Sequence, residues 1–252
     1  MAILFLRLAG PMQSWGIQSR FTNRDTALEP SKSGVIGLLC AALGKPRTED
    51  APPPPGHPGW PSLTELAALK MGVRVDYPGT VKRDYHTAGG FHLKKDSGYG
   101  VPTADGKSRR TVTSDRFYLA DAVFLVALQG DRKLLGSLHN ALLHPVWPLY
   151  LGRKAFVPGY PVWLKDGFRP DIDDLKVALT SYPYLCPTKR NPPDILRLEL
   201  EVGYGEGHLV KPDQPECFVS MERRFGLRYV TTSQVERAKL PEAKEELCTS
   251  PS

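Results

Sequence analysis

The sequence lacks an apolar run of about 18 residues, the length that a helix needs to cross a lipid bilayer. Its N-terminus also lacks the basic stretch that precedes the apolar core of a secretory signal, and instead resembles a β-strand. Cysteine is scarce: the four cysteines are far apart, and none has the CxxC or Cys/His spacing of a zinc site. We therefore expect a cytoplasmic protein with free thiols, no membrane contact, no metal site and no cofactor.

Glycine and proline, in contrast, are abundant, with 23 and 24 of the 252 residues. This content is high for a helical bundle and predicts many turns and short strands. Hydrophobic residues make up 41% of the chain and charged residues 24%, which is ordinary globular usage and excludes a wholly disordered chain. The length fits one large domain or two small ones.

Positive charge is concentrated in the first two thirds of the chain. Residues 1–169 contain 22 Lys and Arg against 13 Asp and Glu, whereas residues 170–252 contain 11 against 14. A basic, turn-rich front with interleaved aromatic residues and histidines is typical of a surface that binds a polyanion. A basic surface that is merely well solvated has the same composition, so charge alone does not decide between the two.

Strand and helix patterns alternate along the chain. Ser31 or Ser33 is a candidate N-cap for the apolar run 35–43, and Gly44 is a candidate C-terminal stop. Alternating apolar and polar or β-prone residues predict strands at 3–9, 72–77, 111–118, 122–128, 195–202 and 218–230. Helical spacing of apolar residues or a capping box predicts helices at 62–70, 131–144 and 171–179.

This order predicts an α+β fold. Strand, helix, strand, excursion, strand and helix follow one another as in a ferredoxin-like βαββαβ domain of the RRM or RAMP type, which we expect over residues 1–160. Residues 161–252 are expected to form a smaller β-rich C-terminal region with a charged tail.

Residues 78–111 differ from the rest of the chain. They contain six glycines and seven Lys or Arg against three Asp, and few large apolar side chains. Because little in this segment can form a packed core, we expect it to project from the body as an extended β-hairpin.

Several motifs stand in a fixed order along the front of the chain. They are LRLAGPMQSWG at 6–16, RDT at 24–26, PSKSGVIGLL at 30–39, DYHTAGG at 84–90, YLADA at 118–122 and PLYLGRK at 148–154. Together they resemble the CasD family, the RAMP-superfamily subunits of the type I-E CRISPR surveillance complex known as Cascade. The similarity extends from residue 3 to about 160, and ERRF at 222–225 is a basic stretch of the kind that the family has in its C-terminal third.

The resemblance implies a non-catalytic RNA-binding subunit. CasD-like subunits hold the 5′ handle of the CRISPR RNA and pack against the neighbouring backbone subunit and the large subunit. They also insert a glycine-rich thumb near the guide–target duplex, where the thumb kinks the strand. Residues 78–111 occupy the thumb's place in the chain. The expected partners are therefore the CRISPR RNA handle, other Cascade subunits and the target DNA near the guide duplex.

Within these segments, cationic, polar, aromatic and glycine residues are the expected RNA contacts. They are Gln13, Trp15, Gly16, Arg20, Arg24, Ser31, Lys32, Ser33, His86, Thr87, Gly89, Gly90, Lys107, Arg109, Arg110, Arg223 and Arg224.

Some of these positions also have a structural interpretation. Ser31 and Ser33 are either phosphate ligands beside Lys32 at a helix N-terminus or simple helix caps. Trp15 either stacks on an unpaired base or fills the core beneath its loop, and we favour core packing. Gln13 is the stronger candidate for RNA contact, since an amide between two turn residues can read a base edge in a splayed strand.

Two alternative functions are considered. Related subunits of the type I-C branch cut precursor RNA without metal, using a tyrosine and an adjacent Lys-His pair as acid–base groups. This sequence has no Lys-His dipeptide, and Tyr85-His86 beside Lys82-Arg83 is its only similar cluster. We therefore expect no catalytic residue. The second alternative is a ferredoxin-like domain whose basic face serves protein assembly alone.

Overall fold

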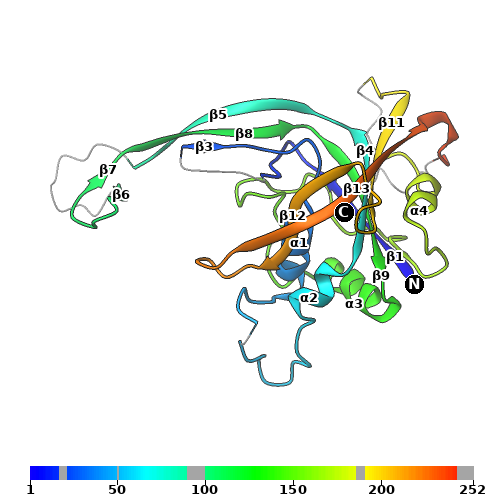
Figure 1. Ribbon diagram of the computed structural model, residues 1–252, viewed down its shortest axis with the longest axis horizontal. Helices are drawn as coiled ribbons and strands as arrows, with labels where there is room; N and C mark the ends of the chain where they lie inside the picture. The colour runs from blue at the N-terminus through cyan, green and yellow to red at the C-terminus, as the bar shows by residue number, and fades with distance from the viewer. Residues whose placement is uncertain (17–21, 50, 90–99, 186–190, 243–252) are drawn as a thin grey trace.

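The centre of the molecule is a seven-stranded antiparallel sheet, with the order β10-β1-β9-β4-β11-β13-β12 (Figure 1). The structure is a computed structural model that describes residues 1–16, 22–49, 51–89, 100–185 and 191–242. The strands of this sheet are β1 (Ala2–Ala9), β4 (Lys70–Tyr77), β9 (Val123–Gly130), β10 (Phe168–Arg169), β11 (Ile195–Val202), β12 (Leu209–Cys217) and β13 (Arg224–Glu236). Because β11 pairs with β4, the C-terminal strands continue the sheet that the N-terminal strands begin.

Helices cover both faces of this sheet. They are α1 (Lys32–Leu43), α2 (Leu63–Ala67), α3 (Arg132–Leu143), α4 (Leu175–Ser181) and a 3-10 turn at Arg237–Lys239. In β1, Leu4 and Leu6 pack in the cluster that contains α1 and α3, whereas Ile3 and Phe5 pack in the cluster that contains α4. Successive strand residues point to opposite faces, so a continuous apolar run suits a strand that is covered on both sides. Within the described ranges, no helix is long and apolar enough to span a membrane.

The caps expected from the sequence are confirmed. Ser31 is the N-cap of α1, and its hydroxyl accepts a hydrogen bond from the Gly34 backbone N–H at 3.3 Å. Gly44 ends this helix in the left-handed region, with φ of 66°. Ser62 and Glu65 make both hydrogen bonds of a capping box at α2.

The sequence does not predict strand β12. Pro212 and Pro215 interrupt its pattern, because proline has no N–H to donate to a neighbouring strand. In the structure β12 is the outermost strand and pairs with β13 alone, so a missing donor on its open side is tolerated. The pairing also shifts register between Lys211 and Gln214, where Pro212 lies. The expectation of a final strand at 218–230 is corrected to Arg224–Glu236, since the residues before it form the turn from β12.

A long hairpin arm projects from the body (Figure 1). Its stem consists of β5 (Thr80–Ala88) and β8 (Val112–Ala120), which are antiparallel over nine residue pairs, and its tip carries β6 (Val101–Pro102) and β7 (Arg109–Arg110). β8 also pairs with β2 (Met12–Gln13) at the base of the arm and, in parallel, with β3 (Asn23–Arg24) midway along the stem. Residues 78–89 and 100–111 leave the body, as expected from the sequence, while residues 90–99 lie outside the described part of the chain.

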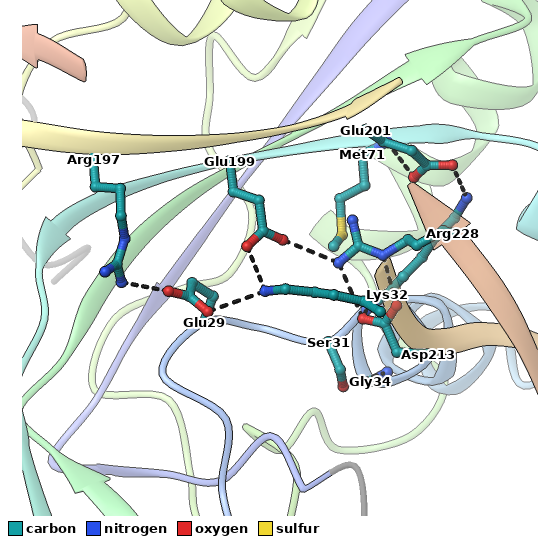
Figure 2. Close-up of polar contacts among 11 residues, drawn as sticks. Glu29, Ser31, Lys32, Gly34, Met71, Arg197, Glu199, Glu201, Asp213 and Arg228 are labelled. Carbon is teal, nitrogen blue, oxygen red and sulfur yellow. Dashed lines mark hydrogen bonds and ion pairs between the residues drawn. The ribbon is translucent and has the colours of Figure 1, made fainter. Parts of the chain in front are cut away.

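Ion pairs join the start of α1 to the C-terminal strands (Figure 2). Lys32 is only 1% exposed, and its ammonium lies 2.7 Å from Oε1 of Glu201 on β11, while its backbone N–H donates to Asp213 on β12 at 2.9 Å. Asp213 also accepts hydrogen bonds from Arg228 on β13 at 2.6 and 3.0 Å. Arg228 in turn donates to Glu199 on β11 at 3.2 Å. We refer to these five residues as the buried ion network.

The buried ion network depends on mutual pairing. Burial is the main influence on Lys32 and lowers the pKa of its ammonium, while the charge of Glu201 and its hydrogen bond oppose that shift. Burial also disfavours the charged form of Arg228, but its hydrogen bond to Asp213 and the nearby carboxylates raise the pKa of this guanidinium overall. Towards the surface, Glu199 pairs with Lys211, which also contacts Glu29. Removing one partner would leave a buried charge uncompensated.

We predict that Glu201→Gln lowers the free energy of unfolding by about 3–5 kcal/mol, because it leaves the Lys32 ammonium buried without a counter-charge. Urea unfolding at neutral pH measures this loss. Glu222→Gln, at an exposed position, is the matched control and is expected to change stability by less than about 0.5 kcal/mol. The double variant Lys32→Met/Glu201→Gln should recover much of the loss. A loss for Glu201→Gln as small as the control's would contradict the prediction.

Candidate nucleic-acid interface

A pocket of about 800 Å³ forms where four segments that are distant in the sequence meet. Its walls are α1 with the residues that follow it up to Arg47, the segment after β2 together with Arg24 on β3, the loop 147–154 and the turn between β12 and β13. The buried ion network holds two of these walls together, because it joins the first residue of α1 to β12 and β13.

The lining is cationic and aromatic. Its charged residues are Arg24, Lys45, Arg47, Arg153, Lys154 and Arg223, and its aromatic residues are Trp15, Trp147, Tyr150, Phe218 and Phe225. Among the described residues that line the pocket, none is Asp or Glu. Lys45 is paired with Glu49 at 3.0 Å, whereas the other five cations have no carboxylate partner in the described part of the chain. Cations with interleaved aromatic rings suit a single-stranded nucleic acid, because the cations can pair with its phosphates and the rings can stack on its bases.

Arg153 is the cation whose position is best defined. One of its terminal nitrogens donates to the backbone carbonyls of Arg24 at 3.2 Å and Asp25 at 3.5 Å, and its guanidinium lies over the Phe156 ring at 5.5 Å. Partial burial lowers the pKa of Arg153, and repulsion by Arg116 and Arg24 lowers it further. These contacts fix a positive charge at the edge of the pocket.

Arg116 extends the positive charge onto the stem of the arm. It lies on β8 as the register partner of Arg24 on β3, and its Nε donates to the hydroxyl of Ser114 at 3.0 Å. Burial and the charge of Arg24 lower the pKa of Arg116, while Asp84 opposes the shift. The positive surface therefore continues from the pocket to the middle of the hairpin stem, where Arg116 pairs with Asp84.

The pocket brings together several residues that the sequence nominates. Gly16, Arg24, Ser33 and Arg223 line it, and Arg224 follows directly as the first residue of β13. Ser31 also lines the pocket, but it is buried and its hydroxyl caps α1, as in the structural interpretation.

Two nominated residues point into the protein instead, and a third, Trp15, borders the pocket but is almost fully buried. Gln13 is fully buried: its amide donates to the carbonyls of Leu8 at 3.1 Å and Ala122 at 2.7 Å, and its oxygen accepts from the Trp15 indole at 3.2 Å. The expectation that Gln13 reads a base is therefore corrected. Trp15 is 1% exposed and packs in the main core, as favoured. Lys32 is corrected from a phosphate ligand to a member of the buried ion network.

The other nominated residues that the structure describes lie on the arm, and none of them lines the pocket. His86 and Thr87 are on β5, and Nδ1 of His86 is 3.4 Å from Asp84. Lys107 precedes the tip strand β7, which contains Arg109 and Arg110, all three exposed. Arg20 and Gly90 lie outside the described residues.

The fold itself explains why position 89 is a glycine. Its φ is 87°, and a Cβ there would lie 2.9 Å from the Arg110 carbonyl oxygen and 3.1 Å from the Gly100 Cα. Only glycine fits this close approach of the two sides of the hairpin without strain. Its presence is thus explained without an RNA contact.

Sequence reasoning missed part of the lining. Arg47, Trp147, Phe218 and Phe225 lie in loops or at a strand end, where no periodic pattern marks them. Tyr150, Arg153 and Lys154 did have a signal, because they belong to the PLYLGRK motif. In the described part of the chain, no three His, Cys, Asp or Glu side chains gather in a way that would hold a metal ion.

Comparisons with known proteins agree with the motifs. The family described as CRISPR-associated protein, Cas5, matches residues 3–231. CRISPR system Cascade subunit CasD of Escherichia coli (strain K12) is 34% identical over 237 residues, which is 89% of this chain and 92% of that protein. A crystal structure of a Cas protein superposes with a TM-score of 0.70 at 40% identity, covering 96% of this chain and 98% of the other. A chain of a CRISPR RNA-guided surveillance complex superposes with a TM-score of 0.71 at 36% identity, covering 93% and 90%.

If Gln13 is structural, Gln13→Leu should destabilise the fold by about 3 kcal/mol or more, since two buried carbonyls and an indole N–H lose their partner at about 1–3 kcal/mol each. Thermal and urea unfolding give this value. Gln234→Leu, at an exposed position on β13, serves as the matched control and should be nearly neutral. A neutral Gln13→Leu would contradict the structural role.

Proposed function

The chain belongs to the Cas5 family of CRISPR-associated proteins, and we propose that it is the subunit of a Cascade complex that holds the 5′ handle of the CRISPR RNA. The observation that carries this proposal is the pocket, with its cations, its aromatic rings and no acidic residue in its described lining. A single-stranded RNA segment satisfies such a surface, because its phosphates neutralise the cations and its unpaired bases stack on the rings.

We further assign the fold to the ferredoxin-like class of the RAMP superfamily. Element order and sheet order support this assignment: β1, α1, β4, β9, α3 and β10 follow as βαββαβ, and their strands are arranged β10-β1-β9-β4. In this interpretation the strands β11, β13 and β12 are an addition to the β4 edge of the domain.

The arm is the proposed thumb. Its stem is rigidified by nine backbone pairs, and its tip presents Lys107, Arg109 and Arg110 to solvent. A cationic tip of this kind suits contact with the guide near the target DNA, where a wedge would kink the strand. The similarity to a Cascade subunit and to a chain of a CRISPR RNA-guided surveillance complex supports other Cascade subunits as protein partners. We propose the neighbouring backbone and large subunits as these partners and the cytoplasm as the place of action.

We propose that the subunit is not catalytic. Tyr85 and His86 are successive residues of β5, so their side chains point to opposite faces of the arm. Lys82 lies on the same face as His86, while Arg83 lies on that of Tyr85. Acid–base cleavage of RNA needs its groups to converge on one phosphate, and this strand separates them.

The decisive experiment incubates the purified chain with labelled repeat RNA in the presence of EDTA. We expect retention of the RNA without cleavage, because the pocket binds phosphates and bases but supplies no converging acid and base. Cleavage would favour the metal-independent endoribonuclease instead. Failure to retain the RNA, alone or within the assembled complex, would favour a role in protein assembly.

A substitution that fills the pocket should weaken RNA binding without harming the fold. Gly37 lines the pocket in the middle of α1, and a Cβ there would meet nothing within 4 Å. Gly37→Ala is expected to raise stability by about 0.5–1 kcal/mol, and Gly37→Leu to keep the fold while weakening RNA binding about tenfold or more.

Gly136→Ala is the matched control for Gly37→Ala. This glycine lies inside α3, where an added Cβ would be in ordinary contact with Phe168 at 3.7 Å, and it does not line the pocket. It should raise stability similarly and leave RNA binding unchanged. Unfolding curves and filter-binding titrations separate the two effects, and full RNA affinity in Gly37→Leu would exclude the pocket as the RNA site.

A further inference from the structure

We propose that Arg24, Arg116 and Arg153 together form a site for one phosphodiester group of the bound RNA, at the junction between the pocket and the arm. This inference rests on the proposed function, and it assigns a specific ligand group to three side chains. The three residues come from β3, from β8 and from the loop 147–154, so no single sequence motif contains them.

The backbone places the three side chains together. Arg24 and Arg116 are register partners in the parallel pairing of β3 with β8, and paired residues of neighbouring strands share one face of the sheet. Arg153 reaches this pair from the loop, because its guanidinium donates to the backbone carbonyl of Arg24 itself. Two of the three, Arg24 and Arg153, also line the pocket.

Two of the guanidinium groups are held in position while keeping donors to spare. Arg116 uses Nε for the buried hydroxyl of Ser114, which leaves both terminal nitrogens for a ligand. Arg153 uses one terminal nitrogen for the carbonyls of Arg24 and Asp25, and its stacking on Phe156 fixes the plane of the group. A guanidinium has five N–H donors, and its flat fork matches the oxygens of a phosphate.

The charge at this place is not balanced by the protein. In the described part of the chain, none of the three guanidinium groups has a carboxylate oxygen within 4 Å, whereas Arg74 and Arg228 each have one at 2.6 Å. Asp84, the cross-strand partner of Arg116, and Asp25 both act electrostatically on Arg153, but these two negative charges face three cations. Burial and mutual repulsion lower the pKa of both Arg116 and Arg153. A bound phosphodiester would relieve this repulsion.

The geometry favours a phosphate of the RNA over one of the target DNA. The site lies midway along the stem of the arm, and two of its three arginines line the pocket that the handle is proposed to occupy, whereas the cationic residues Arg109 and Arg110 lie at the tip. A single phosphate contact can be tested directly. Neutralising the one linkage that makes the contact should remove its contribution to RNA affinity, while all other linkages keep theirs.

The test is a methylphosphonate walk along the single-stranded repeat-derived handle RNA, in which one linkage at a time is made neutral. With the wild-type chain we expect one linkage whose neutralisation weakens binding about tenfold beyond its neighbours. With Arg116→Gln that extra loss should disappear, because the variant has already lost the contact between the guanidinium and the phosphate of that linkage. Arg24→Gln, at an exposed position, should give the same pattern and serves if Arg116→Gln folds poorly.

Arg83→Gln is the matched control. Arg83 is on the neighbouring strand of the same arm, but it lies on the opposite face, is 60% exposed and pairs with Asp115 at 3.7 Å. The Arg83→Gln variant removes one positive charge at a similar distance from the body. The linkage whose neutralisation weakens binding most in the wild-type chain should therefore keep its extra effect in this variant. Melting temperatures of all variants verify that they are folded.

The outcomes separate this inference from the function on which it rests. If the RNA binds but no linkage loses its extra effect in Arg116→Gln or Arg24→Gln, the three-arginine site is wrong and the RNA-binding function stands. If the assembled complex places the coupled linkage in the target DNA strand, the assignment to RNA is wrong. If neither the chain nor the complex retains the RNA, the proposed function fails, and the site fails with it.

Discussion

The position of α1 against the C-terminal strands depends on the ion pair between Lys32 and Glu201, and much of the molecule depends on that position. An apolar contact would tolerate small shifts, whereas a buried ammonium is stable only in one place, within reach of its carboxylate. The backbone N–H of the same lysine donates to Asp213, which Arg228 also holds. The start of α1 and the β12–β13 hairpin are thus fixed together, and these are opposite walls of the pocket.

This constraint explains how charge is distributed around the pocket. Lys32 at the start of α1 has the sequence context of a phosphate ligand, yet its ammonium is buried and paired with Glu201. The cations of the pocket come instead from β3, from the segment that follows α1, from the loop 147–154 and from the β12–β13 turn. Arginine suits these positions, because its fork can bond the backbone with one edge, as Arg153 does, and still offer the other edge to a phosphate.

Sequence reasoning was accurate where a local rule decides the outcome. Ser31 and Gly44 bound α1 because capping is a matter of a few neighbouring residues, and the projecting segment 78–111 is evident from its glycines and cations. It was inaccurate where distant residues decide. Gln13 is a buried structural amide because Leu8 and Ala122 present carbonyls to it, and the second of these is 109 residues away. Strand β12 exists because it lies at the edge of a sheet, a position that no local pattern of Pro212 and its neighbours indicates.

The separation between pocket and arm tip has a consequence for the proposed function. The stem has nine paired residues, and at about 3.3 Å per residue it places the tip roughly 30 Å from the root of the arm. Under the proposed function, Arg109 and Arg110 at the tip would contact a stretch of nucleic acid several nucleotides away from the one held in the pocket. Because the stem is a continuous ladder that β2 and β3 join to the body, this spacing is built into the protein, and the two proposed contacts would set a fixed distance along the bound strand.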